Sequence, residues 1–145
     1  MLETTYKFYL SFENAACVDY ITEKVWKILT INVVPVVLGG ADYKRHLPPH
    51  SYIDVRDFRS AKHLADYLLM LSRNDALYRK YFEWKRHYGI SPQNSLCQLC
   101  AYMNRVYGQN DTGMTLDRFA YFADIGQQCI KPENYFSPED FRTFA

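Results

Sequence analysis

The sequence lacks the features that mark several common classes of protein. Seventeen Lys and Arg residues nearly balance 16 Asp and Glu residues, so the formal net charge is only +1. This balance gives no support for nucleic-acid binding, which normally uses a strongly basic face. No apolar run approaches the roughly 18 residues of a membrane-spanning helix. The first residues lead directly into Lys7 and a predicted strand, so we expect neither a transmembrane helix nor a signal peptide.

The chain also lacks internal repeats, low-complexity tracts and an obvious linker. Its 145 residues leave room for one domain with a proper core. Hydrophobic residues make up 48% of the chain and aromatic residues 17%, which excludes an intrinsically disordered segment. The composition therefore predicts one folded piece of protein.

Residues 6–40 (YKFYLSFENAACVDYITEKVWKILTINVVPVVLGG) predict a strand, a helix and a second strand. Residues 7–13 alternate with a period of two, which is typical of a half-buried strand. The alternation places two sets of side chains on opposite faces: Phe8, Leu10 and Phe12 against Lys7, Tyr9 and Ser11.

Residues 19–31 have helical spacing, because Ile21, Val25 and Ile28 can share one face. The short β-branched run at residues 33–38 reads as a buried strand that ends at Gly39. A strand, helix and strand in this order form the right-handed crossover unit of an α/β domain.

Polar residues gather where the first strand leads into this helix. Open α/β sheets bind their ligands outside the carboxyl ends of the strands. A helix N-terminus carries unpaired N–H groups and a partial positive charge, and Lys24 adds a full one, so a phosphate would be stabilised there. Glu23 is suited to accept hydrogen bonds from ribose hydroxyls. The alternative is an ordinary helix, capped by Thr22 or Asp19, with a solvated Glu-Lys pair.

The same segment carries a resemblance to a known family. It contains an F-x-L-x-F-E-N strand, a D-Y-x-T-E-K helix start and a V-P-V-V-L-G strand, in this order, and residues 43–55 (YKRHLPPHSYIDV) continue the pattern. Together these segments resemble the α1,3/α1,4-fucosyltransferases, which form glycosyltransferase family 10. The similarity extends over about residues 5–107, and its first forty residues are highly specific.

The resemblance implies a GT-B glycosyltransferase and an α/β fold. The chain is similar to the Rossmann-like C-terminal domain, in which a parallel sheet is flanked by helices. The implied reaction transfers L-fucose, with inversion and in α1,3 linkage, from GDP-fucose to N-acetylglucosamine of a glycoprotein or glycolipid glycan. Carried over by position, Asn14 and Lys24 contact the diphosphate, Glu23 holds the ribose hydroxyls and Tyr20 lines the pocket. Glu13 is expected to support the site or to cap the helix. No metal or other cofactor is implied.

The family's general base is a carboxylate on the N-terminal domain, and a further phosphate-binding arginine also lies upstream of this segment. Neither has a counterpart here, so no residue of this chain is expected to be the general base, and we expect little or no transfer by these 145 residues alone. The alternative is a non-catalytic module of a truncated fucosyltransferase that binds GDP-fucose or another partner. A related enzyme that uses another nucleotide sugar fits the complete signature less well. The resemblance also implies that the enzyme lies in the lumen of the Golgi as part of a type II membrane protein, whose anchor is absent from this chain.

The rest of the sequence predicts further helices around the sheet. We expect the donor-binding domain, with its C-terminal helices, at residues 1–107 and an extension that packs on it at residues 108–145. Residues 42–47 predict a helical turn and residues 52–55 a third strand. Ser60 is a suitable N-cap for a helix at residues 61–71, Asn74 for an aromatic helix at residues 75–87 that is buried on most of its surface, and residues 94–107 predict another helix. Less specific features follow in the extension: a sequon at residues 110–112, a helix within residues 114–125 and an aromatic, acidic end at residues 135–145.

Four cysteines remain to be explained: Cys17, Cys97, Cys100 and Cys129. The C-x-x-C at residues 97–100 lacks the two further ligands of a zinc site and the strand–helix context of a thioredoxin-like site. In animal members of the similar family, a C-terminal C-x-x-C forms structural disulfides, in some cases with upstream cysteines that this chain lacks. Cys97 and Cys100 could pair with each other or stay free, and the sequence leaves the pairing of all four open.

Overall fold

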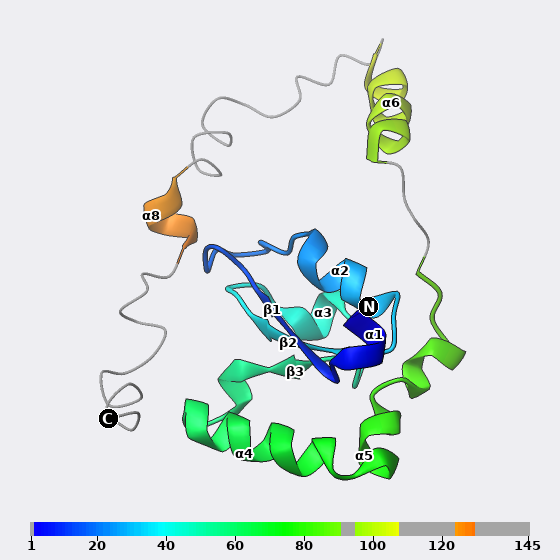
Figure 1. Cartoon of the computed structure of the whole chain (residues 1–145). Helices are drawn as coiled ribbons and strands as arrows, with labels where there is room; N and C mark the ends of the chain where they lie inside the picture. Colours follow the sequence, from blue (N-terminus) through cyan, green and yellow to red (C-terminus); the bar gives the residue numbers. More distant parts are fainter. Residues whose placement is uncertain (1, 91–94, 108–123, 130–145) are drawn as a thin grey trace.

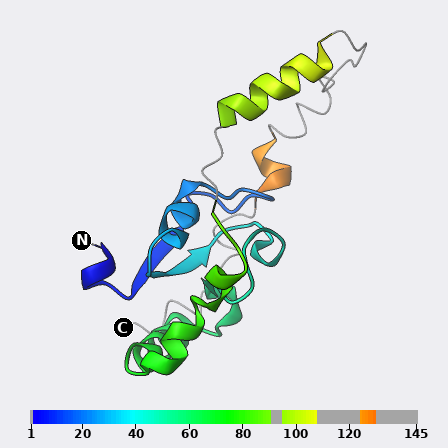
Figure 2. The same ribbon diagram turned by 90° about the vertical axis from the view of Figure 1, so that its right-hand side faces the viewer.

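The computed structural model describes residues 2–90, 95–107 and 124–129. Its centre is a parallel sheet of three strands in the order β1-β2-β3, with helices on both faces (Figures 1 and 2). The expected α/β class is therefore confirmed. Within the described ranges, no helix combines the length and the hydropathy needed to cross a membrane.

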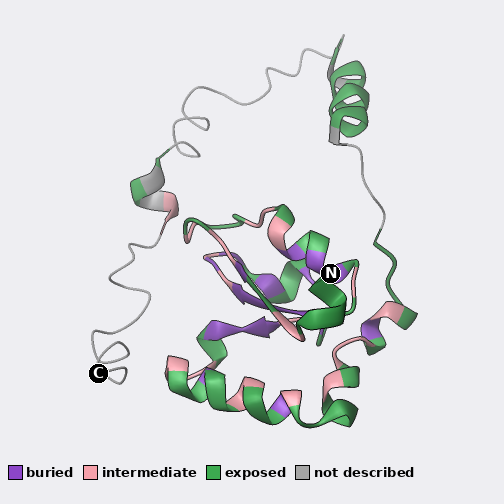
Figure 3. Cartoon of the chain, in the orientation of Figure 1, coloured by how far each residue is buried: buried purple, intermediate pink, exposed green. Residues whose placement is uncertain are grey.

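The strands are short, and the central one is the most buried. β1 (Phe8–Phe12) pairs with β2 (Val34–Leu38) along its whole length, from Phe8 opposite Val34 to Phe12 opposite Leu38. β3 (Ile53–Asp54) pairs with β2 on the other side. An apolar, β-branched sequence suits β2 because helices cover both of its faces (Figure 3).

Two hydrophobic clusters separate the sheet from its helices. On one face, α2 (Glu23–Leu29), α3 (Tyr43–His46) and the 3-10 turn η2 (Glu83–Arg86) meet the sheet. This cluster comprises Val25, Leu29, Val37, Tyr43, Leu47 and Trp84. On the other face lie η1 (Val55–Asp57), α4 (Ala61–Ser72) and α5 (Asp75–Lys80). This second cluster comprises Val34, Val36, Ile53, Val55, Leu64 and Leu71.

The predicted strand at residues 7–13 is confirmed as β1, and its side chains alternate between the two faces, but at two positions burial does not follow polarity. Ser11 is buried at 1% exposure, whereas Leu10 is 59% exposed. Ser11 pairs in register with Val37, whose side chain belongs to the cluster under α2. Phe8 and Phe12 pack against the second cluster, but the packing there leaves Leu10 between them accessible. Which residue is buried thus depends on where the covering helices lie.

Two predicted helices are shorter than their spacing suggested. The helix expected at residues 19–31 begins only at Glu23, because Asp19 has a positive φ of 56° and lies in a turn. The aromatic helix expected at residues 75–87 divides into α5 and η2. Burial over most of its surface is also wrong, since Tyr78, Tyr81, Phe82 and Trp84 pack inward while most other side chains there are exposed.

Local capping signals were more reliable. The hydroxyl of Ser60 accepts a hydrogen bond from His63 N at 3.1 Å, and the amide oxygen of Asn74 accepts one from Leu77 N at 3.1 Å. Both predicted N-caps are therefore confirmed. The chain begins with one exposed helical turn, α1 (Leu2–Thr5), whose Glu3 carboxylate accepts a hydrogen bond from Asn32 N.

The C-terminal third is described in two pieces. The predicted helix at residues 94–107 is confirmed as α6 (Ser95–Val106), and α8 (Ile125–Gln128) is a single turn. α6 lies apart from the sheet in both views (Figures 1 and 2), and its Leu96, Leu99 and Met103 are exposed. The sequon, the aromatic end and residues 114–123 of the expected C-terminal helix lie outside the described residues.

Candidate donor site at the carboxyl edge of the sheet

The candidate site lies where all three strands end. β1 leads into residues 13–22, β2 into Gly39 and Gly40, and β3 into η1. Because the strands are parallel, their carboxyl ends meet at one edge of the sheet. The predicted donor residues follow β1, so the fold places them at the edge where such sheets bind ligands.

Glu13 joins the two ends of the segment between β1 and α2. Its backbone N donates to Leu38 O at 2.8 Å, which extends the pairing of β1 and β2 by one residue. Its carboxylate accepts hydrogen bonds from Thr22 N at 2.8 Å and from Thr22 Oγ1 at 2.7 Å. The Glu13 side chain is only 1% exposed, so these bonds replace the water that a buried carboxylate loses. We call residues 13–22, closed by Glu13 and Thr22, the donor loop.

Lys24 contacts the first part of this loop. Its Nζ donates to Phe12 O at 2.8 Å and to Asn14 Oδ1 at 2.6 Å, and lies 3.7 Å from Glu13 Oε2. The buried carboxylate thus offsets the charge of an ammonium group that is 28% exposed. An ammonium group has three N–H donors, and Phe12 O and Asn14 Oδ1 accept hydrogen bonds from two of them. The Lys24 ammonium group is thus held at the edge of the sheet, with one side exposed to solvent.

The structure brings two of the four expected donor residues into direct contact. Asn14 and Lys24 are hydrogen-bonded, whereas Tyr20 and Glu23 present exposed side chains from the donor loop and the first residue of α2. In the part of the chain that the structure describes, neither of these side chains reaches the Asn14–Lys24 pair. All four nevertheless belong to one continuous corner between β1 and α2.

Of the two residues predicted to cap α2, Asp19 does not cap it, and Thr22 acts differently from the prediction. Asp19 does not cap α2, because it lies in the turn in which Tyr20 N donates to Cys17 O at 3.2 Å. Thr22 does occupy the N-cap position, but its side chain makes no capping bond to the helix and instead donates to Glu13. Glu13 contacts both Thr22 and Lys24, which fits the supporting role expected of it, and that role stays a prediction. Glu13 lies nine residues from Thr22 in the sequence, so local spacing could not identify it as the competing partner.

Gly40 allows the donor loop to approach the end of β2. A Cβ atom at this position would lie 2.5 Å from the backbone C and O of Ala16 and 2.6 Å from Cys17 O. Such contacts are too close for any other residue unless the backbone moves. The sequence predicted a tight turn at Gly39 and Gly40; the structure adds close packing of two backbones as the reason for glycine.

Arg56 forms a second polar cluster at the same edge, which the sequence did not single out. Its guanidinium donates to Asp54 Oδ2 from Nη2 at 2.7 Å and to Asp54 Oδ1 from Nε at 3.0 Å. Nη2 also donates to Ala41 O at 3.1 Å. These residues border a cavity of about 340 Å³ beyond β2 and β3. The available signal was position alone, since Arg56 closely follows the short third strand.

A larger cavity of about 1020 Å³ lies beside α2, α3 and η2. Its lining is mostly apolar, with Trp26, Leu29 and Trp84 among the described residues, and basic at one side, with Lys44 and Arg45. The four expected donor residues are not among those that line it. Across the described ranges, no three His, Cys, Asp or Glu side chains gather in a way that could hold a metal ion.

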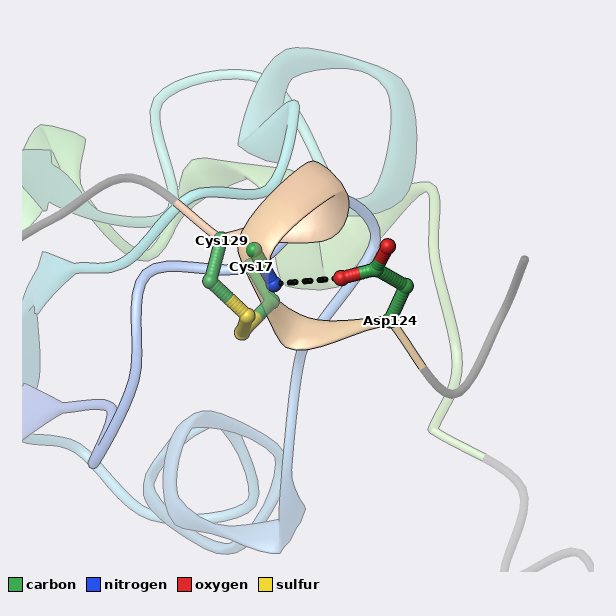
Figure 4. The surroundings of a disulfide bond; sticks show 4 residues. Cys17, Asp124 and Cys129 are labelled. Carbon is green, nitrogen blue, oxygen red and sulfur yellow. Dashed lines mark hydrogen bonds between the residues drawn. A yellow bond between two sulfur atoms is a disulfide. The ribbon is translucent and has the colours of Figure 1, made fainter. Parts of the chain in front are cut away.

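The structure assigns the cysteines that the sequence left open. Cys17, in the middle of the donor loop, forms a disulfide with Cys129 directly after α8 (Figure 4). Cys97 and Cys100 are exposed free thiols on α6. Two bonded residues 112 positions apart share no local pattern, so their pairing could not be predicted from spacing.

Comparison with known proteins agrees with the signature of residues 6–40. The family described as "Glycosyltransferase family 10 (fucosyltransferase) C-term" matches residues 1–118. Alpha-(1,3)-fucosyltransferase C of Drosophila melanogaster is 50% identical over 101 residues, which are 70% of this chain and 24% of that protein. Alpha-(1,3)-fucosyltransferase 4 of Homo sapiens is 48% identical over 108 residues, which are 70% of this chain and 20% of that protein. The chain thus spans about a fifth to a quarter of the length of these relatives.

Solved structures show the same fold. Crystal structures of an alpha1,3-fucosyltransferase with GDP and with GDP-fucose each superpose with a TM-score of 0.59 and 23% sequence identity. Each match covers 75% of this chain and 34% of the solved one. The family match over most of the sequence, the two relatives and the shared fold lead to one conclusion: the chain belongs to glycosyltransferase family 10, the fucosyltransferases, and corresponds to the C-terminal part of that family.

Proposed function

We propose that this chain forms the GDP-fucose-binding part of an α1,3-fucosyltransferase. The enzyme transfers L-fucose, with inversion, to N-acetylglucosamine of a glycoprotein or glycolipid glycan. The observation that carries the proposal is the contact of Lys24 with Asn14 at the carboxyl edge of a Rossmann-like sheet. Membership of the family supports the reaction, and the structures of a similar enzyme with GDP and GDP-fucose support the donor.

Each of the four residues has a role that suits its chemistry. Lys24 keeps its ammonium at the surface beside Asn14, and we assign both to the oxygen atoms of the diphosphate. Glu23 is exposed at the first position of α2, where its carboxylate can accept two hydrogen bonds from vicinal ribose hydroxyls. Tyr20 is 38% exposed on the same loop and provides an aromatic surface for the donor.

No residue of this chain is assigned to the general base. Inverting transfer needs a carboxylate that removes a proton from the acceptor hydroxyl. Near Lys24, the Glu13 carboxylate is buried and bonded to Thr22, and Glu23 is assigned to the ribose. We propose that another part of the enzyme supplies the base and that this chain binds donor without transferring fucose. We also propose a Golgi-lumenal, membrane-anchored enzyme; the Cys17–Cys129 disulfide fits that oxidising compartment.

Calorimetric titration of the chain with GDP and GDP-fucose tests the proposal. We expect Lys24→Ala to weaken the binding of both ligands by about 1.5–3 kcal/mol, which is the usual contribution of a charged hydrogen bond. Lys27→Ala is the matched control, because Lys27 lies on the same helix but borders the separate apolar cavity. Equal loss in both variants would indicate general electrostatic attraction in place of a specific site.

A second variant tests the assignment of Glu23 without disturbing the buried Glu13–Lys24 pair. Glu23→Gln should weaken the binding of GDP but should change the binding of 2′-deoxy-GDP less. That analogue lacks one of the two hydroxyls from which Glu23 accepts a hydrogen bond. The two ligands should therefore bind the variant with more similar affinity than they bind the wild-type chain. If the wild-type chain binds neither GDP nor GDP-fucose although circular dichroism shows that it is folded, the alternative of a non-catalytic interaction module is favoured.

A further inference from the structure

The middle of the donor loop has little packing of its own. Its ends are fixed by the bonds between Glu13 and Thr22, but most side chains between them are exposed, and Val18 is 60% exposed. A loop with few buried apolar contacts opens easily unless other interactions restrain it. The candidate donor residues Asn14 and Tyr20 both lie in this stretch, each three positions from Cys17.

Several contacts restrain the loop, and they converge on Cys17. The backbone of Ala16 and Cys17 rests against Gly40 at the end of β2. Cys17 O accepts the hydrogen bond from Tyr20 N that closes the turn. Cys17 is also paired with Cys129 in an antiparallel bridge, where Val18 N donates to Gln128 O at 2.7 Å. An exposed contact between Asp19 and His46, at 3.5 Å, adds little.

The segment that carries Cys129 is itself ordered by local contacts. Asp124 Oδ1 accepts a hydrogen bond from Gly126 N at 2.9 Å at the start of α8, and Cys129 follows the helix directly (Figure 4). The disulfide therefore attaches the exposed turn of the donor loop to a short helical element (Figures 1 and 4).

We infer that the Cys17–Cys129 disulfide is a positioning element of the donor site, which holds the turn at residues 17–20 so that Asn14 and Tyr20 face the nucleotide. The inference rests on the proposed function of the donor loop. The disulfide takes no part in a chemical step. Its effect is preorganisation, because a loop that is already ordered loses less conformational freedom when the ligand binds.

GDP titration of the oxidised chain tests this role, with two double variants. Cys17→Ala/Cys129→Ala removes the disulfide, and we expect roughly tenfold weaker GDP binding, which corresponds to about 1.4 kcal/mol. Cys97→Ala/Cys100→Ala is the matched control, since it also removes two cysteines, but from exposed free thiols on α6. This control should bind GDP like the wild-type chain.

Amide hydrogen exchange separates positioning from general destabilisation. In the Cys17/Cys129 variant, the amides of Val18 and Tyr20 should exchange faster, while those of β2 should keep their protection. Should this variant fail to fold, reduction of the wild-type chain with dithiothreitol replaces it, because reduction opens the Cys17–Cys129 disulfide and removes no side chain. The amides of Val18 and Tyr20 should again exchange faster.

The outcomes distinguish this inference from the proposed function. Equal GDP affinity of the wild-type chain and the folded Cys17/Cys129 variant would overturn the positioning role and leave the donor site intact. Absence of GDP binding by the folded wild-type chain would count against the proposed function. In that case exchange alone decides whether the disulfide orders the loop: faster exchange of Val18 supports it, and unchanged exchange overturns it.

Discussion

The region around the sheet and helix α6 use similar apolar patterns with opposite results. In α4, Leu64 and Leu71 repeat at helical spacing and are buried against the sheet. In α6, Leu96, Leu99 and Met103 repeat in the same way, but each is more than half exposed. The comparison teaches that helical periodicity predicts an apolar face, whereas burial depends on a second surface that covers it.

The largest expected effect comes from matched leucine substitutions in these two helices. Leu71→Ala removes a side chain that is 1% exposed in the second cluster and should lower the free energy of unfolding by about 2–5 kcal/mol. Leu99→Ala, at 55% exposure on α6, should change it by no more than about 0.5 kcal/mol. Urea denaturation measures both. Equal losses would mean that α6 is packed in solution, and the comparison would fail.

A buried and an exposed carboxylate extend the comparison to polar groups. Glu13→Gln should lower the free energy of unfolding by about 1.5–3 kcal/mol, because the bonds from Thr22 and the attraction to Lys24 lose their charge. Asp66→Asn is the control, since its bond with Lys62 joins two exposed side chains and contributes less than about 0.5 kcal/mol. Thermal denaturation of both variants at neutral pH measures the difference. A stable Glu13→Gln chain would show that the donor loop closes without this bond.

Gly40 and Gly89 show the same contrast between a packed and an open position in the backbone. Gly40→Ala should lower the free energy of unfolding by about 1–3 kcal/mol, because its Cβ meets the Ala16 backbone, which cannot rotate away as a side chain could. Gly89→Ala should be neutral or stabilise the chain by up to about 1 kcal/mol, because among the described residues no atom beyond the adjacent ones lies within 4 Å of an added Cβ. The measurement is again urea denaturation. Similar effects at both positions would exclude the close packing of the donor loop on β2.

The smallest expected effect is a difference in alkaline stability. Burial, and to a smaller degree the hydrogen bond with Tyr67, raises the pKa of Tyr81 above its ordinary value of 10.0. The unfolded chain then loses this proton first, so the stabilisation is complete below about pH 10 and declines as the pH rises further. Tyr81→Phe should therefore lose less stability than the wild-type chain above this pH. Tyr102→Phe on exposed α6 is the control, and an unchanged pH profile of Tyr81→Phe contradicts the prediction.

The sequence predicted those parts of the fold that depend on neighbours along the chain. The alternation predicted β1, and the β-branched run predicted β2. The caps Ser60 and Asn74 each accept a hydrogen bond from a backbone amide only three residues further along the chain. Thr22 shows the limit of such reasoning. It is a good cap by type, but a buried carboxylate nine residues earlier in the chain takes its hydroxyl.

The candidate site was predicted to a similar extent. The family signature and the position after β1 indicated the corner that holds Asn14 and Lys24, and the structure adds their direct contact. The partners of Gly40 and Cys17 could not be predicted, because close backbone approach and a disulfide across 112 residues arise only when distant segments meet. Arg56 was not singled out because its contact with Ala41 O joins two segments 15 residues apart, which meet only at the sheet edge.

The most direct test of the account is a two-dimensional amide NMR spectrum of the isotope-labelled chain, recorded during titration with GDP. We predict that the amides of Asn14, Tyr20, Glu23 and Lys24 shift together at the carboxyl edge of the sheet, while those of Leu99 and Met103 on α6 keep their positions. Shifts confined to α6 or to the apolar cavity beside Trp84, with the donor loop unchanged, would contradict the account.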